Sequence, residues 1–143
     1  MCVFCKIVNN EIPGQKVYEN DFVAAFLDIN PVNPGHVLVV PKNHIESLLA
    51  ASNEELSHLI IAVKTVAKAV LAALNYEAFN LELNNGAIAG QVVNHLHFHI
   101  VPRKEGDGLT HWPGQQYREG EMEAVAEKIR NSLKVAGQIN NIR

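Results

Sequence analysis

The chain has 143 residues, which fits a single domain that can bury an ordinary core without cross-links. Its 48% of hydrophobic and 19% of charged residues are typical of a soluble globular protein, and a formal net charge of −3 gives no electrostatic footprint for nucleic acid. No apolar run reaches the roughly 18–20 residues of a membrane span, and the N-terminus lacks the pattern of a signal peptide. We therefore expect a cytoplasmic protein with neither nucleic acid nor a membrane as partner.

The first predicted strands lie in the N-terminal third of the chain. Residues 17–19 and 22–27 are rich in β-branched and aromatic residues, and Asn20-Asp21 between them favours a turn. Residues 36–40 are continuously apolar after their first position, which predicts a buried strand. Pro41 is expected to end that strand because it has no backbone N–H.

One long helix follows. Ser52 and Glu55 have the spacing of a capping box, and Asn75 can end the helix. Helical spacing places one set of apolar residues on a single face: Leu56, Leu59, Ile60, Val63, Val66, Ala67, Val70, Leu71 and Leu74.

The second half of the chain is expected to add two strands and a helix. Residues 78–83 read as a strand, and residues 95–101 as another that Pro102 ends. Residues 121–136 read as an amphipathic helix with Gly137 as its stop. The pattern predicts an α+β fold with a mainly antiparallel sheet of about five strands, one long helix and a C-terminal helix. A single domain over residues 1–143 is expected, with its core in 2–103 and a C-terminal loop and helix in 104–143.

The run from His95 to Val101 alternates histidines with large apolar residues. In a strand, His95, His97 and His99 would share one face, roughly 7 Å apart from one to the next, above a core of the alternate residues. Neutral imidazole is a competent nucleophile toward an activated phosphorus, provided that one ring nitrogen is held and the other presents its lone pair. His97, at the centre, is the candidate nucleophile, and His99 could protonate the leaving group and then activate water.

Two further motifs lie near this row. Residues 84–91 carry Asn84, Gln91 and two glycines, and such a loop can donate to phosphate oxygens, although Asn-Gly is first of all a turn signal. Cys2-x-x-Cys5 supplies half of a tetrahedral zinc site, which His44 and His95 could complete; two free thiols are the alternative. A row of three imidazoles could also bind one catalytic metal ion, although alternating ligands converge on a common ion with difficulty.

These residues together resemble the histidine triad (HIT) family, and the chain looks closest to its bacterial Hit and Hint-like members. Residues 95–101 satisfy every position of the family motif His-φ-His-φ-His-φ-φ, where φ is apolar. The resemblance covers most of residues 2–103, including Phe4–Val8, Glu11–Pro13, Phe26–Ile29, Gly35–His44 and Asn84–Arg103.

The resemblance implies a nucleotide hydrolase or transferase that cleaves a nucleoside monophosphate from its leaving group. It makes His97 the nucleophile of a nucleotidyl-histidine intermediate, gives His99 the α-phosphate and leaving group, and places His36 at the phosphate end. It assigns nucleotide binding to Val3, Phe4, Phe26, Asp28, Ile29, Asn84, Gln91 and Val92, with Asp28 on the ribose hydroxyls. It further implies a purine nucleotide substrate, such as an AMP conjugate or a dinucleoside polyphosphate.

The resemblance also implies a homodimer and a structural zinc ion on Cys2, Cys5, His44 and His95, with no organic cofactor. The chain departs from the family at one position. Val92 stands where related members often carry Ser or Thr, so the side-chain hydroxyl that helps to protonate a leaving amine is missing. A nucleotide-responsive binding protein with weak catalysis is therefore the alternative function.

Overall fold

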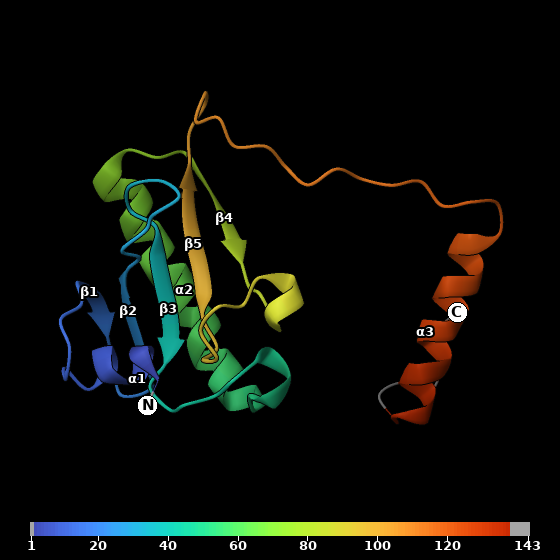
Figure 1. The fold of residues 1–143 in the computed structure, drawn as a ribbon, viewed down its shortest axis with the longest axis horizontal. Coiled ribbons are helices and arrows are strands. Elements are labelled where there is room, and N and C mark those ends of the chain that lie inside the picture. Colours follow the sequence, from blue (N-terminus) through green and yellow to red (C-terminus); the bar gives the residue numbers. More distant parts are fainter. Residues whose placement is uncertain (1, 138–143) are drawn as a thin grey trace. The chain divides into compact units, whose positions relative to one another are not determined.

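The computed structural model describes residues 2–137 and divides into two units, Met1–Asp107 and Gly108–Arg143. The first unit contains these elements in chain order: α1 (Val3–Val8), β1 (Lys16–Glu19), β2 (Val23–Leu27), β3 (Val37–Pro41), a short 3-10 turn η1 (Leu48–Ala50), α2 (Asn53–Leu74), β4 (Ala78–Glu82), a second 3-10 turn η2 (Ala87–Ala89) and β5 (Phe98–Arg103) (Figure 1). The second unit contains α3 (Glu121–Val135).

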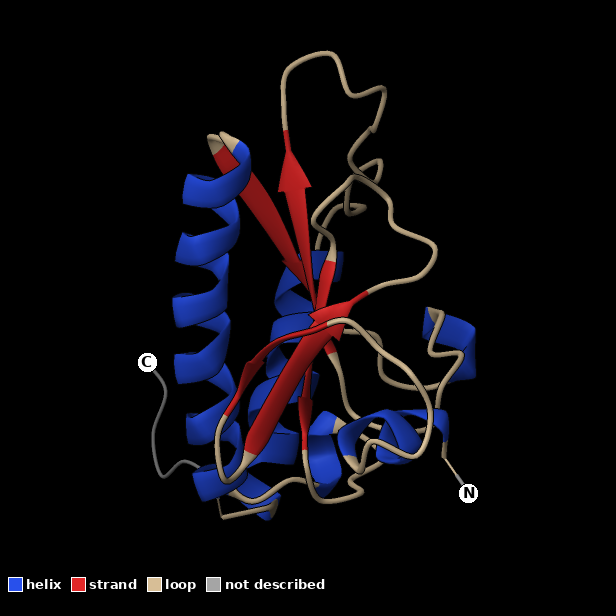
Figure 2. Cartoon of the chain, turned by 90° about the vertical axis from the view of Figure 1, so that its left-hand side faces the viewer, coloured by secondary structure: helices blue, strands red, loops and turns tan. Residues whose placement is uncertain are grey.

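The five strands form one antiparallel sheet in the order β1-β2-β3-β5-β4. β5, the last strand in the chain, therefore lies between β3 and β4 and brings His99 opposite Leu38 on one side and Glu82 on the other. The strand directions rotate across the sheet, as the twist of antiparallel strands requires (Figure 2). This architecture confirms the predicted α+β class with its antiparallel five-stranded sheet and long helix.

Each face of the sheet buries its own cluster of apolar side chains. The cluster on the α2 face contains Val23, Ala25, Val37, Val39, Leu96 and Ile100 from the sheet region and Ile45, Leu59, Ala62, Val63, Val66, Ala67 and Val70. The cluster on the α1 face contains Phe4, Val8, Ala24, Phe26, Leu38 and Val40. Successive residues of β2 and β3 thus enter opposite clusters, which is why both strands are almost continuously apolar.

The ends of α2 agree with the sequence prediction. The Ser52 hydroxyl accepts the Glu55 N–H, the Glu55 carboxylate accepts the Ser52 N–H, and Asn75 ends the helix in the left-handed region with a φ of 55°. Within residues 2–137, α2 is the one helix long and apolar enough to cross a membrane by length and composition. Its buried residues pack against the sheet, and core helices of this kind commonly have the length and apolar composition of a membrane-spanning helix.

Gly35 fixes the approach to β3. Its φ of 92° lies in the left-handed region, and a Cβ atom built on it would collide with Cδ1 of Leu74 in α2. The glycine therefore lets the turn before β3 lie directly against the end of the long helix, with His36 as the next residue.

Several elements in the first unit differ from the prediction. α1 was not predicted at all. β3 includes Pro41, and β5 begins only at Phe98 and runs through Pro102. The prolines are tolerated because the pairing of β3 with β5 covers only Val37–Val39 and Phe98–Ile100, so neither proline removes a hydrogen bond of that ladder.

The second unit was predicted closely. Residues 108–118 contain no helix or strand, and α3 spans nearly the expected range, from Glu121 to Val135. Gly137 follows with a φ of 69°, as a helix stop commonly does.

Candidate functional site

The alternation predicted for the histidine row is confirmed, although only part of the row is strand. Leu96, Phe98 and Ile100 pack in the cluster on the α2 face, whereas His97 and His99 line a cavity on the α1 face. The ring centroids of His97 and His99 are 4.8 Å apart. Residues 93–95 form bends and no strand begins before Phe98, so the row leads into β5 from a loop in which the Leu96 N–H donates to the Ile45 carbonyl.

The neutral tautomer of His97 is set by the backbone. Its Nδ1 lies 2.6 Å from the carbonyl oxygen of His95, and since a carbonyl can only accept, Nδ1 carries the proton. Nε2 therefore presents its lone pair. The ring is buried and meets Phe4 edge-to-face, with 5.1 Å between the ring centroids. This is the arrangement that a histidine nucleophile requires.

A second chain of hydrogen bonds sets the tautomers of His36 and His99. The Val32 N–H donates to His36 Nδ1 at 3.1 Å, so the proton of neutral His36 is on Nε2. That Nε2–H donates to His99 Nδ1 at 2.9 Å, which leaves the proton of His99 on its Nε2. His99 is thus prepared as a hydrogen-bond donor on the ring next to that of His97.

The pKa values support this neutral chain. Burial first, and then the neighbouring His97 and His36, lower the pKa of His99 to about 4, against a smaller opposing effect of Asp28. Burial also lowers the pKa of His36, against the opposing effect of the Asp28 carboxylate, whose Oδ2 lies 3.8 Å from His36 Nε2. Both rings are therefore neutral near pH 7. This agrees with the hydrogen bonds above, in which Nδ1 of each ring accepts and so carries no proton.

The cavity beside these histidines has a volume of about 390 Å³, within the range of about 300–1,000 Å³ that is common for small-molecule sites. Eight of the predicted site residues line it: Val3, Phe4, Phe26, Asp28, Ile29, Val92, His97 and His99. Sequence reasoning missed the other eight: Ile7, Pro13, Gly14, Leu27, Asn30, Leu38, Gly90 and Val93. Most of the missed residues flank predicted ones along the chain, so only the fold could reveal which of them reach the cavity.

Three residues predicted as catalytic or nucleotide-binding do not line this cavity. His36 is buried behind His99 and can reach a ligand only through that ring. Gln91 closes its own loop, since its Oε1 accepts the Gly86 N–H and its Nε2 donates to the carbonyls of Glu46 and Val93. Asn84, half-buried, lies under Gly90 of the same loop.

Asp28 provides the anionic end of the cavity wall. Its Oδ1 accepts the Asn30 N–H at 2.8 Å, which fixes the carboxylate at the end of β2. The side chain is partly exposed on the cavity side, so it can still accept hydrogen bonds from ligand hydroxyls.

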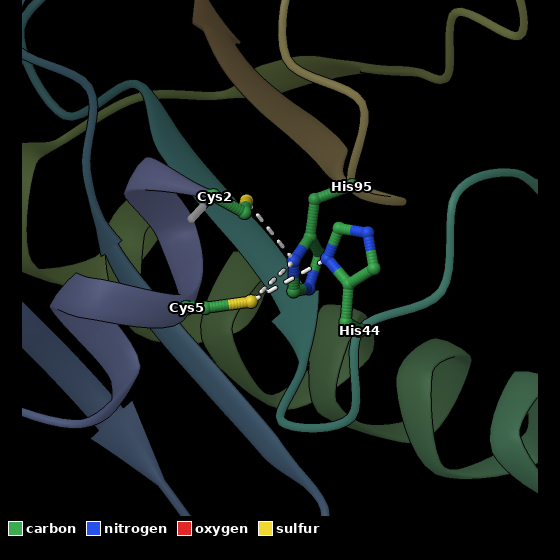
Figure 3. A group of neighbouring side chains, drawn as sticks. All are labelled: Cys2, Cys5, His44 and His95. Atoms are coloured by element: carbon green, nitrogen blue, oxygen red, sulfur yellow. Dashed lines mark hydrogen bonds between the residues drawn. The ribbon is translucent and has the colours of Figure 1, made fainter.

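The four predicted metal ligands converge from three separate segments (Figure 3). Their ligand atoms all lie within 4.8 Å of one another. Cys2 Sγ and Cys5 Sγ are each 3.5 Å from His95 Nδ1, and Cys5 Sγ is 3.4 Å from His44 Nδ1. A tetrahedral zinc ion with bonds of about 2.3 Å to sulfur and about 2.05 Å to nitrogen holds such atoms about 3.5 Å apart. The donor set and its spacing therefore fit zinc.

Local structure prepares these donors. Cys2 precedes α1 and Cys5 lies one turn later, so the helix that the sequence did not predict places both thiols on one side. His95 Nε2–H donates to the Pro41 carbonyl at 2.9 Å, which leaves Nδ1 as the ligand atom. Burial raises the pKa of the Cys5 thiol and the adjacent Cys2 raises it further, so a cation is needed to hold Cys5 as a thiolate.

A catalytic metal ion on the three histidines finds no support in the described part of the chain. The groups whose ligand atoms converge there are the Cys2 group and a second one of Asp28, His36 and His99. In the second group the Val32 N–H occupies His36 Nδ1, so Nε2 carries a proton and cannot ligate a metal.

Comparisons with known proteins agree with this geometry. The family model for the HIT domain matches residues 9–106. An uncharacterized HIT-like protein of Methanocaldococcus jannaschii is 55% identical over 108 residues, covering 76% of this chain and 83% of the relative. The adenosine 5′-monophosphoramidase of Schizosaccharomyces pombe is 41% identical over 135 residues, covering 93% of this chain and 98% of the relative.

Solved structures give the same result. A HIT family protein from Bacillus anthracis has a TM-score of 0.82 at 43% identity and covers 92% of this chain and 96% of its own. A zinc-bound histidine triad family protein from Mycobacterium smegmatis has a TM-score of 0.73 at 31% identity, with coverage of 92% and 96%. The chain therefore belongs to the HIT family.

Proposed function

We propose that the protein is a nucleotide hydrolase or transferase that works through a covalent nucleotidyl group on His97. The single observation that carries this proposal is the pair of set tautomers on two neighbouring rings of one cavity, which leaves a lone pair on His97 Nε2 and an N–H on His99 Nε2. The name of the S. pombe relative, an adenosine 5′-monophosphoramidase, supports a nucleotide substrate.

In the first step His97 Nε2 attacks the α-phosphorus, and the bond from phosphorus to the leaving group breaks. Because His99 is neutral, full loss of its proton would produce an imidazolate. It therefore acts as a hydrogen-bond donor to the developing charge, and not as the acid that protonates the leaving group, the role expected from the sequence. The leaving group therefore carries its own proton, as a protonated amine does, or departs as a stable anion, as a phosphate chain does. Water then attacks the same phosphorus and the bond to His97 breaks. One proton of that water stays on the monophosphate and the other passes to solvent.

The cavity suits a nucleoside monophosphate. Val3, Phe4 and Phe26 offer an apolar slot for a base, and Asp28 offers a carboxylate for ribose hydroxyls. We favour a purine nucleoside phosphoramidate or a dinucleoside polyphosphate as substrate. Val92, which is almost fully exposed, provides no hydroxyl near the leaving group, so leaving groups that need a proton from the protein should react slowly.

Zinc is proposed to be a structural component on Cys2, Cys5, His44 and His95. The fit of the donor distances supports this, as does the zinc-bound relative from M. smegmatis. Zinc at this position would tie α1, which carries Phe4, to the segment that carries His97.

The test is AMP release from adenosine 5′-phosphoramidate and from a diadenosine polyphosphate, by wild type, His97→Ala and the control His111→Ala. Wild type and the control should release AMP, and His97→Ala should not, although it should still bind AMP in calorimetry. Turnover retained by His97→Ala would contradict the nucleotidyl-histidine mechanism. If wild type binds AMP but releases none from either substrate, the result favours the alternative of a nucleotide-responsive binding protein.

A further inference from the structure

Asn33 is a buried polar side chain that lies outside the cavity. Its Nδ2 donates to the Pro102 carbonyl at 2.8 Å and to Asp107 Oδ2 at 3.2 Å. The Asp107 carboxylate is itself held, because Arg103 donates to it from Nε at 2.7 Å and from a terminal nitrogen at 3.0 Å. Arg103 also donates to Asn80 Oδ1 on β4 at 2.7 Å. The side chain of Asn33 therefore attaches the loop before β3 directly to the end of β5 and to Asp107, and through Arg103 it is linked to β4.

The backbone around Asn33 holds His36. The Asn33 carbonyl accepts the His36 N–H at 3.0 Å, and the preceding residue, Val32, donates its own N–H to His36 Nδ1. The Asp28 N–H donates to the His36 carbonyl at 2.9 Å, which closes the loop from its other end. The direction of the Val32 N–H thus depends on a loop that Asn33 attaches to the sheet.

We propose that Asn33 is a positioning residue which, through the Val32 N–H, holds His36 in the Nε2–H tautomer and so makes His99 a donor toward the cavity. Its effect on turnover rests on the proposed function, whereas its effect on the tautomers does not.

The opposite tautomers would reverse the chemistry of the site. A proton on His36 Nδ1 would face the Val32 N–H, and the lone pair on His36 Nε2 would then require a proton on His99 Nδ1. His99 would in that case present a lone pair to the cavity, where an anionic phosphate needs a donor. If the loop turned the Val32 N–H away from His36 Nδ1, nothing would favour the Nε2–H tautomer of His36 over the Nδ1–H tautomer, and His99 would no longer be held as a donor.

The experiment measures imidazole nitrogen shifts by long-range ¹H–¹⁵N NMR in wild type, Asn33→Ala, Asn33→Asp and Tyr76→Phe. Asn33→Asp keeps the size of the side chain but replaces the donor with an acceptor that faces a carbonyl and a carboxylate. Tyr76→Phe is the matched control, because the Tyr76 hydroxyl donates to the Pro34 carbonyl at 2.9 Å in the same loop.

In wild type and Tyr76→Phe, we expect the proton of His36 and of His99 on Nε2. In both Asn33 variants, we expect mixed tautomers at both rings. With a substrate that wild type hydrolyses, kcat of the Asn33 variants should fall roughly tenfold while KM changes little, because His99 no longer donates to the developing charge in part of the molecules. Wild-type His36 with its proton on Nδ1 would overturn the proposal without any variant. Unchanged tautomers in the folded Asn33 variants would also overturn it, and neither result bears on whether His97 is the nucleophile.

Discussion

His95 connects the candidate metal centre to the candidate nucleophile. Its imidazole Nδ1 faces Cys2 and Cys5, and its carbonyl oxygen accepts the Nδ1–H of His97 at 2.6 Å. Phe4 makes a second connection, because it lies between the two cysteines in α1 and contacts both histidine rings, with centroid distances of 6.0 Å to His95 and 5.1 Å to His97. Loss of the metal ion should therefore alter the positions of His97 and Phe4 in the cavity.

The first prediction concerns removal of the metal. Cys5→Ser should lower the zinc content from about one ion per chain, lower the melting temperature by several degrees and weaken AMP binding, because α1 loses its attachment. Zinc is measured by elemental analysis and melting by calorimetry. His58→Ala, a histidine outside the cysteine group, is the control and should keep its zinc. Wild type that is purified without zinc and is not stabilised by added zinc would contradict the prediction.

The sequence predicted which way the residues of the histidine row face, because alternation is a local signal. Alternation alone places Leu96 and Ile100 in one cluster and His97 on the opposite face, and the structure agrees. The metal ligands could be predicted only as candidates, since spacing in the sequence does not show that His44 and Cys5 approach to 3.4 Å.

Other features depend on tertiary contacts that no local pattern contains. α1 has only six residues, several of them β-branched, and its apolar residues are explained only by the sheet on which they pack. Gln91 looks like a phosphate ligand in the sequence, yet its amide holds the Gly86 loop. Whether Pro102 ends a strand depends on which neighbouring strand is paired at that position.

The second prediction concerns Asp28 and the ribose. Asp28→Asn should weaken AMP binding by about ten- to a hundredfold, because a hydrogen bond to a charged group contributes roughly 1.5–3 kcal/mol. The same change should weaken 2′-deoxy-AMP binding less, since that ligand lacks one of the hydroxyls. Calorimetry with both nucleotides measures the difference. Equal losses for the two ligands would show that Asp28 does not contact the 2′-hydroxyl.

The third prediction concerns assembly. β4 is an edge strand of the sheet and exposes Phe79 and Leu81, and α2 exposes Ile60, Ile61 and Leu74. Apolar side chains on an edge strand and a helix favour association with a second copy. We expect a homodimer in light scattering at micromolar concentration, and Leu81→Lys should shift it toward the monomer. A monomeric wild type under those conditions would contradict this expectation.

The last prediction concerns pH and follows from His99. Its pKa is about 4 in the folded protein, against 6.5 for the free side chain, because the buried ring loses hydration and lies beside two other imidazoles. Between these values the unfolded chain binds more protons than the folded one, so stability rises with pH across this window. The contribution is complete above about pH 6.5 and is lost as the pH falls toward about 4. Because the ring keeps some contact with solvent, we expect a loss of about 1–2 kcal/mol.

Denaturant unfolding of wild type and His99→Gln at about pH 7 and about pH 5 measures this contribution. Glutamine cannot titrate but can still accept the His36 Nε2–H, so the variant should lose less stability than wild type on acidification. The pKa values of His36 and His95 are also lowered by burial, and their contributions remain in both proteins. The difference between the two pH dependences therefore belongs to His99. Identical dependences would mean that its ring is as easily protonated in the folded protein as in the unfolded chain, and the neutral donor proposed for the cavity would then have to be abandoned.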